Sequence, residues 1–202
     1  MRASTRTLAL DVAIGVLAGL AATKVTEWAQ TALYRATPTQ VQAQEERVRP
    51  GPPAEMAAED LAGRFGVSLD DEARGRAGNV IHYALGAVWG PLYGLLRHHG
   101  RMTAPGAGLL SGAAMSLLVD ETLTPALGYS APNRDYPALT HVRGFIGHLV
   151  FGAANAVVAE ALYRLIDRCV DLNVPMFHRN RSADALAARD GFQPSAFRSG
   201  SR

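Results

Sequence analysis

The chain has 202 residues, a length that favours one domain of ordinary size. Its formal net charge of +2 is too small to indicate a nucleic-acid partner, and no basic stripe interleaved with aromatic residues occurs in it. The single cysteine, Cys169, excludes an internal disulfide and a cysteine-rich metal site. The sequence contains no nucleophile elbow, phosphate-binding loop, HExxH or CxxC motif, so no motif supports an enzyme.

The mean hydropathy of +0.02 averages strongly polar and strongly apolar segments. Four apolar stretches are predicted to be membrane spans, at about residues 8–34, 77–96, 105–127 and 142–166. A bilayer core of about 30 Å requires about 20 helical residues. The alternative, a soluble alanine-rich bundle, would have a charged face on each helix. Residues 109–119 and 149–159 contain no ionisable side chain on any face, which favours lipid.

The four stretches carry a duplicated pattern of small residues at intervals of four. The first and third stretches share the order Gly15, Gly19, Thr23, Glu27 and Gly108, Gly112, Ser116, Asp120. The second and fourth stretches share the order Gly78, His82, Gly86, Gly90 and Gly144, His148, Gly152, Ala156. Residues four apart lie on one face of a helix, and small residues allow two helix backbones to approach closely. The sequence therefore predicts an all-α, four-span transmembrane helix bundle built from a duplicated two-helix unit.

The segments between the spans predict the orientation of the chain. Basic residues flank the N-terminus, the short second connection and the end of the fourth stretch: Arg2, Arg6, Arg97, Arg101, Arg164 and Arg168. The third connection carries only Arg134, which Asp135 balances. Positive charge marks the cytoplasmic side in short loops, so both termini are expected in the cytoplasm.

The remaining segments predict a cap and a tail around the four-helix membrane domain of residues 1–170. Residues 53–72 of the long first connection are expected to form a short amphipathic helix on the outer surface, and Ser68 with Asp71 resembles a capping box for the second span. Residues 171–202 are expected to form a polar cytoplasmic tail.

Each two-helix unit brings a carboxylate and an imidazole onto its small-residue face. At 1.5 Å per residue, His82 and His148 lie about 8–9 Å, and Glu27 and Asp120 about 10–13 Å, below the outer boundary. Ionisable groups at such depth normally point inward and pair. These four residues are the candidate proton-titrating cluster, and Glu121 either joins it or faces the outer loops.

Several roles for this cluster are open at the level of sequence. The acid–histidine pairs are hydrogen bonds that only hold the bundle together, groups that sense or carry protons, or ligands of a metal ion. The candidate metal ligands are Glu27, His82, Asp120 and His148. Haem held by His82 and His148 is disfavoured because acids lie close by. No cofactor is predicted.

Other polar residues and the Gly-rich helix faces have structural interpretations. Asp11 is expected at a hydrated helix end, His98 and His99 in a solvated turn, and Glu160 in a local ion pair with Arg164. Lys24 is expected to snorkel or to pair with Glu27. The Gly-rich faces that include Gly86, Gly90 and Gly94 are expected to join copies of the chain or a membrane partner.

Four segments carry a resemblance to a known family: residues 14–29 (IGVLAGLAATKVTEWA), Pro52 and Pro53 before a short helical insert, residues 78–86 (GNVIHYALG) and residues 143–152 (RGFIGHLVFG). In these segments and their order, the chain resembles the YagU-like bacterial inner-membrane proteins. The resemblance implies a four-span protein of the inner membrane that is linked to survival in acid. Glu27, His82 and His148 fall where the family pattern has an acid and histidines, whereas Asp120 departs from it because a histidine is expected near that position.

The prediction for function is a multi-pass protein of the bacterial inner membrane that is proton-responsive or related to acid stress. The alternatives are a structural or assembly membrane subunit without transport or catalysis, and a metal- or haem-binding membrane protein.

Overall fold

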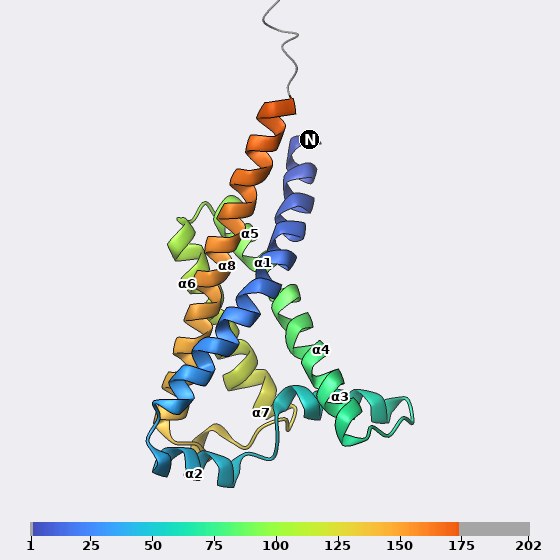
Figure 1. The fold of residues 1–202 in the computed structure, drawn as a ribbon, viewed down its shortest axis with the longest axis vertical. Coiled ribbons are helices and arrows are strands. Elements are labelled where there is room, and N and C mark those ends of the chain that lie inside the picture. Colours follow the sequence, from blue (N-terminus) through green and yellow to red (C-terminus); the bar gives the residue numbers. More distant parts are fainter. Residues whose placement is uncertain (1, 174–202) are drawn as a thin grey trace, which may run out of the picture. The chain divides into compact units, whose positions relative to one another are not determined.

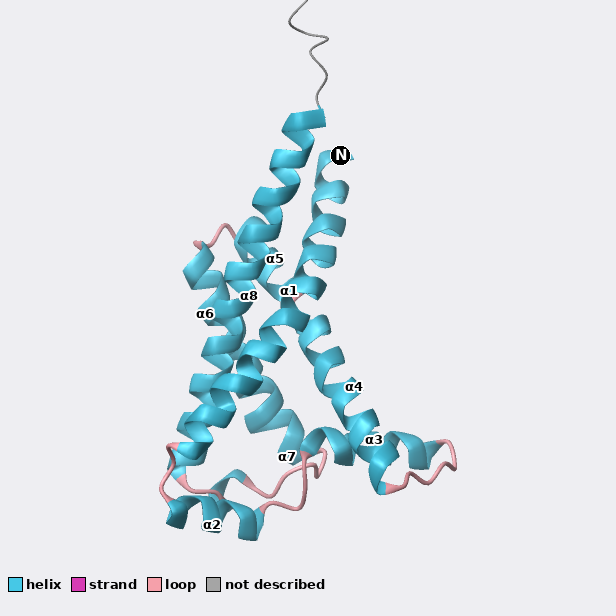
Figure 2. Cartoon of the chain, viewed as in Figure 1, coloured by secondary structure: helices cyan, strands magenta, loops and turns pink. Residues whose placement is uncertain are grey.

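The computed structural model describes residues 2–173, with side chains for residues 8–169. Every regular element in this described part is helical, and it contains no strand (Figure 2). The chain divides into two units, Met1–Tyr163 and Arg164–Arg202. Of the predicted polar tail, residues 174–202 lie outside the described residues.

The helices follow one another in the order shown in Figure 1. The bounds are α1 Arg2–Arg35, α2 Thr39–Val48, α3 Pro53–Arg64, α4 Asp71–Trp89, α5 Pro91–Gly94, η1 Leu95–His99, α6 Ala104–Met115, η2 Ser116–Leu123, α7 Thr124–Ala126, η3 Asn133–Asp135 and α8 Ala138–Asn173. The η1 and η2 segments are π-helical, and η3 is a 3-10 turn. The junction residues within α4–α5–η1 and within α6–η2–α7 keep right-handed helical dihedrals, so each set forms one continuous helical path.

Two helices are long and apolar enough to cross a membrane, over Leu8–Arg35 of α1 and Ala138–Cys169 of α8. The paths α4–η1 and α6–α7 coincide with the other two predicted spans in position. The all-helical fold class is therefore confirmed, whereas the number of spans stays a prediction.

Local sequence explains where several helices begin. Pro53 stands at the start of α3, where its missing N–H has no partner to lose. The carboxylate of Asp70 accepts a hydrogen bond from the Ala73 N–H at 2.7 Å and caps α4, so the predicted cap by Ser68 is wrong by two residues. Thr103 caps α6 in the same way, by accepting from the Gly106 N–H at 3.3 Å.

Helix α2 is the element that the sequence did not predict. Its composition is polar, yet Glu45 is completely buried because the chain folds this helix onto the start of α8. Arg143 of α8 donates to both carboxylate oxygens of Glu45, at 2.8 and 2.6 Å, and Thr140 donates to one of them at 3.0 Å. A long-range ion pair rather than an apolar face therefore holds α2 in place.

Glycines allow α1 to cross α4 and α5 at backbone contact. A methyl group on Gly90 would overlap the Gly15 carbonyl oxygen, and one on Gly19 would overlap the Gly86 carbonyl and lie 3.1 Å from the Gly90 Cα. A methyl group on Gly86 would overlap the Thr23 hydroxyl. At Gly86 and Gly90 the small-residue face is therefore occupied within one chain, and the joining of copies of the chain or of a membrane partner through Gly-rich faces stays a prediction.

The same kind of crossing joins α6 to α8 in the second half of the chain. A methyl group on Gly152 would overlap the Gly108 carbonyl oxygen, and one on Gly112 would overlap the His148 carbonyl oxygen. In the duplicated sequence pattern, Gly108 corresponds to Gly15 and Ala156 corresponds to Gly90. Since Gly15 lies against Gly90 in the first crossing, the pattern predicts Gly108 against Ala156, with Gly152 one turn away. The second crossing is displaced by up to one helical turn from the first, which brings His148 itself into the contact.

The distribution of polar and apolar side chains along these helices is the reverse of that in a water-soluble bundle. Large apolar residues are exposed on all four helical paths: Leu8, Val12, Leu17, Trp28, Val80, Val88, Leu109, Leu110, Leu117, Leu118, Val142, Ile146 and Val157. Small and polar residues are buried between the helices, among them Asp11, Thr23, Ser111, Ser116 and Asn155. A compact apolar cluster of Ala22, Met115, Val119 and Phe151 lies between the paths.

Candidate functional site

The first predicted acid–histidine pair forms between α1 and α4. The Glu27 carboxylate lies 3.7 Å from His82 Nε2, which is ion-pair distance but too long for a hydrogen bond. Lys24 donates to the same carboxylate at 2.7 Å, so its predicted pairing with Glu27 is present. Glu27 therefore lies between a fixed positive charge and an imidazole that becomes charged only on protonation.

The second predicted pair forms between η2 and α8. Asp120 Oδ2 lies 3.3 Å from His148 Nδ1, and the same nitrogen lies 2.9 Å from the Gly144 carbonyl oxygen. A backbone carbonyl can only accept, so Nδ1 carries a hydrogen and donates it to Gly144, and the Asp120 carboxylate lies at ion-pair distance from the same nitrogen. The His148 side chain is 13% exposed, whereas the Asp120 side chain is 42% exposed.

Glu121 is directed away from these two pairs. It lies 2.8 Å from His141 Nδ1, while His141 Nε2 lies 3.0 Å from the Asn133 carbonyl oxygen. The Asn133 amide in turn donates to the Glu121 carbonyl oxygen at 2.8 Å. Of the two alternatives for Glu121, the structure supports the one in which it faces the outer loops.

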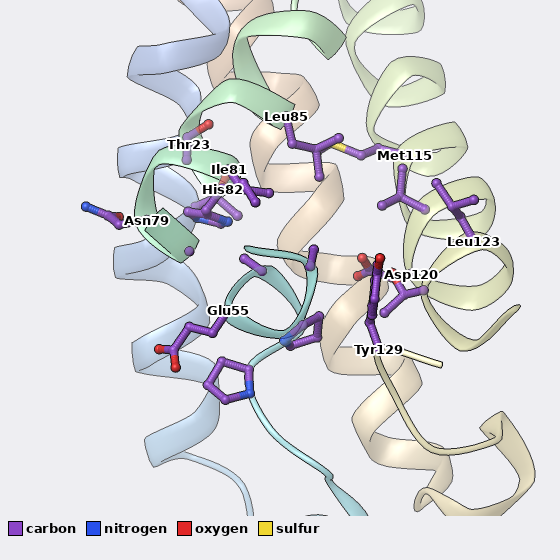
Figure 3. A pocket seen from close by; sticks show the side chains of 18 of the residues that line it. Thr23, Glu55, Asn79, Ile81, His82, Leu85, Met115, Asp120, Leu123 and Tyr129 are labelled. Carbon is purple, nitrogen blue, oxygen red and sulfur yellow. The ribbon is translucent and has the colours of Figure 1, made fainter. Parts of the chain in front are cut away.

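A cavity of about 690 Å³ reaches the histidine of the first pair and both residues of the second. It lies between α1, α4, η2 and α8, and residues of the first turns of α3 also line it. His82, Asp120 and His148 line it, whereas Glu27 does not. Figure 3 shows His82 on the α4 wall and Asp120 with Tyr129 on the opposite wall. The candidate site is therefore one cavity lined by a histidine from α4 and a histidine from α8.

A third acid–histidine contact lies at the other end of the α1–α4–η1 interface, and it corrects two expectations. Asp11 is 1% exposed instead of hydrated, and its Oδ1 lies 2.9 Å from His98 Nδ1 and accepts from the Tyr163 hydroxyl at 2.6 Å. His99 Nε2 lies 3.4 Å from the other oxygen, outside hydrogen-bonding geometry. The turn of His98 and His99 is therefore a partner of a buried carboxylate and not merely solvated.

The spacing of four residues could have predicted the contact between Asp11 and His98. The stripe on α1 continues from Gly15 back to Asp11, and the stripe that begins on α4 continues through Gly94 of α5 to His98 of η1. Gly94 does contact Asp11, since a methyl group on this glycine would lie 2.9 Å from the Asp11 Cβ. One antiparallel register thus places Glu27 against His82 at one end and Asp11 against His98 at the other.

Glu160 forms a second polar contact that the sequence pattern did not predict. Glu160 accepts hydrogen bonds from the Tyr93 hydroxyl at 2.8 Å and from Arg97 Nε at 2.9 Å. Tyr93 is completely buried, so Glu160 satisfies its hydroxyl. Only a local partner on its own helix was predicted for Glu160, because these two donors lie far away in the sequence.

The four candidate metal ligands form two separate contacts, Glu27–His82 and Asp120–His148. Among the residues that the structure describes, no group of three or more His, Cys, Asp or Glu side chains is placed to hold a metal ion. A metal-binding role therefore stays a hypothesis.

Helix α3 is tied to the loop after α7 by a hydrogen bond between Tyr129 and Asp60. Tyr129 donates to the Asp60 carboxylate at 2.8 Å, and Arg64 also binds this carboxylate, so the pKa of Asp60 is lowered and the pKa of Tyr129 is raised. A lowered carboxyl pKa stabilises the fold above the ordinary pKa of aspartate, and this stabilisation is lost as the pH falls through the lowered value.

The variant Tyr129→Phe is expected to raise the Asp60 pKa in an NMR titration, whereas Tyr136→Phe should leave it unchanged. An unchanged Asp60 titration in Tyr129→Phe would show that this hydrogen bond does not hold α3.

No protein-family model matches the sequence, and no curated protein or solved structure is significantly similar to it.

Proposed function

We propose that the chain is a four-span protein of the bacterial inner membrane that responds to protons through its acid–histidine pairs. The observation that carries the proposal is that four carboxylates within apolar helical stretches each lie within ion-pair distance of a histidine. These contacts are Glu27–His82, Asp120–His148, Asp11–His98 and Glu121–His141. The resemblance to the YagU-like proteins, with its implied link to survival in acid, points in the same direction.

The distribution of residues supports membrane insertion. Only 39% and 33% of the most apolar windows of α1 and α8 are buried, so their apolar surface requires a covering other than this chain. The paths α4–η1 and α6–α7 expose large apolar residues in the same way. With the short second connection on the basic, cytoplasmic side, both termini lie in the cytoplasm and the cavity lies in the outer half of the bilayer.

The chemistry of the pairs supports a response to protons. Histidine is the side chain that ordinarily changes charge between pH 5 and 8. Protonation turns each contact into an attractive ion pair, and this attraction is strong where water is scarce. Acidification should therefore strengthen the contacts of α1 with α4 and of η2 with α8.

A structural membrane subunit is the second candidate, and the glycine crossings favour it. In lipid, helix association depends on close packing and on hydrogen bonds between helices. On this alternative the acid–histidine pairs contribute only stability.

The test follows the fluorescence of Trp89, whose indole N–H donates to the Ser111 carbonyl oxygen at 3.0 Å between α4 and α6. In a Trp28→Phe background, Trp89 is the only remaining tryptophan. We expect a fluorescence transition between about pH 7 and pH 5 in liposomes. The double variant His82→Gln/His148→Gln should lose most of its amplitude, because neither imidazole is then present at the cavity.

The matched control is His141→Gln, which removes a histidine that pairs with Glu121 outside the cavity. This variant should keep the transition. An unchanged transition in the double variant, with helical circular dichroism and a single gel-filtration peak preserved, would contradict the proton response. A double variant that loses only thermal stability would favour the structural subunit.

A further inference from the structure

We propose that the cavity between the two outer acid–histidine pairs binds a lipophilic organic cation, with Asp120 as its counter-ion. The site is the one described above, so the proposal rests on the proposed function for its pH dependence but not for binding itself. Size, wall chemistry and charge each support it.

The cavity has the dimensions and walls of a small-molecule site. Ligand pockets usually measure about 300–1,000 Å³ and are mainly apolar with a few convergent polar groups. The 690 Å³ cavity has apolar walls of Leu85, Met115, Val119, Leu123 and Phe151. These residues come from α4, α6, η2 and α8, so a ligand would contact both repeat units.

The ionisable groups on the walls select for positive charge. Among the described residues that line the cavity, Asp120 and Glu55 are acidic, His82 and His148 are imidazoles, and none is Lys or Arg. Arg74 lies 3.6 Å from Glu55 and offsets its charge. Asp120 has only His148 at ion-pair distance, an imidazole that is charged only when protonated.

Asp120 is also the carboxylate that a ligand can reach. Its side chain is 42% exposed, and Figure 3 shows it on the cavity wall beside Tyr129. The aromatic rings of Tyr129 and Phe151 line the same space, and aromatic faces attract cations. A hydrophobic cation therefore finds apolar contacts, aromatic rings and a carboxylate in one cavity.

Protons and the cation should compete for this cavity. The charged or titratable groups around Asp120 are His148 from α8, His82 from α4, Glu55 with Arg74 at the α3–α4 contact, and Glu27 with Lys24 behind His82. Glu121 is held by His141. Protonation of His82 and His148 adds positive charge where the cation would lie, so acid should weaken its binding.

The test measures binding of tetraphenylphosphonium to the purified full chain in detergent by isothermal titration calorimetry. We expect saturable binding near pH 7.5 that weakens about tenfold near pH 5.5. Asp120→Asn should weaken it about tenfold or more. Asp135→Asn, which alters a carboxylate in the outer turn η3, should bind as the natural chain does.

Two further measurements keep the outcome decisive. Triphenylphosphine oxide, an uncharged molecule of similar shape, should bind about tenfold more weakly or not at all. Leu85→Trp should abolish binding by filling the cavity while Asp120 remains, and it serves where Asp120→Asn does not fold. Equal binding of the neutral molecule, or full binding by a folded Asp120→Asn chain, would overturn the proposal.

The failure of this inference is distinguishable from that of the proposed function. Absence of tetraphenylphosphonium binding with a preserved Trp89 pH transition would refute the cation site and leave the proton response intact. Binding that depends on Asp120 but not on pH would support the cation site and contradict its coupling to protons.

Discussion

The variant Glu45→Ala is expected to lose about 3–5 kcal/mol of folding free energy, because it leaves Arg143 nearly buried without its carboxylate. Arg143 is 9% exposed and Glu45 is 0% exposed. The remaining contacts of the guanidinium are a hydrogen bond to the Thr37 hydroxyl at 3.4 Å and the face of the Tyr34 ring, 5.0 Å from its centroid. Unfolding in denaturant followed by helical circular dichroism would measure the loss.

A double-mutant cycle separates the ion pair from simple packing. Replacing both partners, by Glu45→Leu and Arg143→Met together, should recover most of the loss, because the only partner of Glu45 then left without its carboxylate among the described ion pairs is Arg49, whose side chain is 43% exposed. Glu46→Gln is the matched control, since Glu46 is an exposed neighbour that accepts only from the Tyr34 hydroxyl, and it should cost less than about 1 kcal/mol. Equal destabilisation by the double and single variants would show that α2 is held by packing instead.

Residues related by the period of four could be placed from the sequence. Glu27 and His82 lie on the two small-residue faces of one unit, and Asp120 and His148 on those of the other, so their contacts follow from helical geometry once the glycines bring the helices together. The helical paths agree with the predicted stretches for the same reason. The cavity between the pairs could not be predicted from this pattern, because it depends on the distance between the first helix pair (α1 with α4) and the second (η2 with α8).

Contacts between segments without a shared period could not be placed. Glu45 lies in a polar helix with no apolar face, and its partner Arg143 is far away in the sequence. The period alone could have indicated Asp11 opposite His98, but a carboxylate close to a helix end is ordinarily hydrated. Its burial depends on Tyr163, which belongs to a different repeat unit.

Substitution of a crossing glycine by alanine is expected to destabilise the chain by about 1–3 kcal/mol or more. A methyl group on Gly90 would overlap the Gly15 carbonyl oxygen, and one on Gly152 would overlap the Gly108 carbonyl oxygen. A backbone oxygen cannot move aside as a side chain can, so the two helices must separate. In lipid the lost close packing is not replaced by a hydrophobic gain between helices. Thermal unfolding of the chain in detergent would measure the effect.

Gly75→Ala is the matched control, because Gly75 lies on α4 with nothing within 4 Å of an added methyl group. It should be neutral or stabilising by up to about 1 kcal/mol, since alanine favours a helix over glycine.

The two crossing variants should also differ in their pH response. Gly90→Ala separates α1 from α4 and disturbs both Glu27–His82 and Asp11–His98, whereas Gly152→Ala acts on the crossing that contains His148. If either variant melted as the Gly75→Ala control does, the backbone contact would not be what holds that pair of helices, and the acid–histidine distances that depend on it would lose their support.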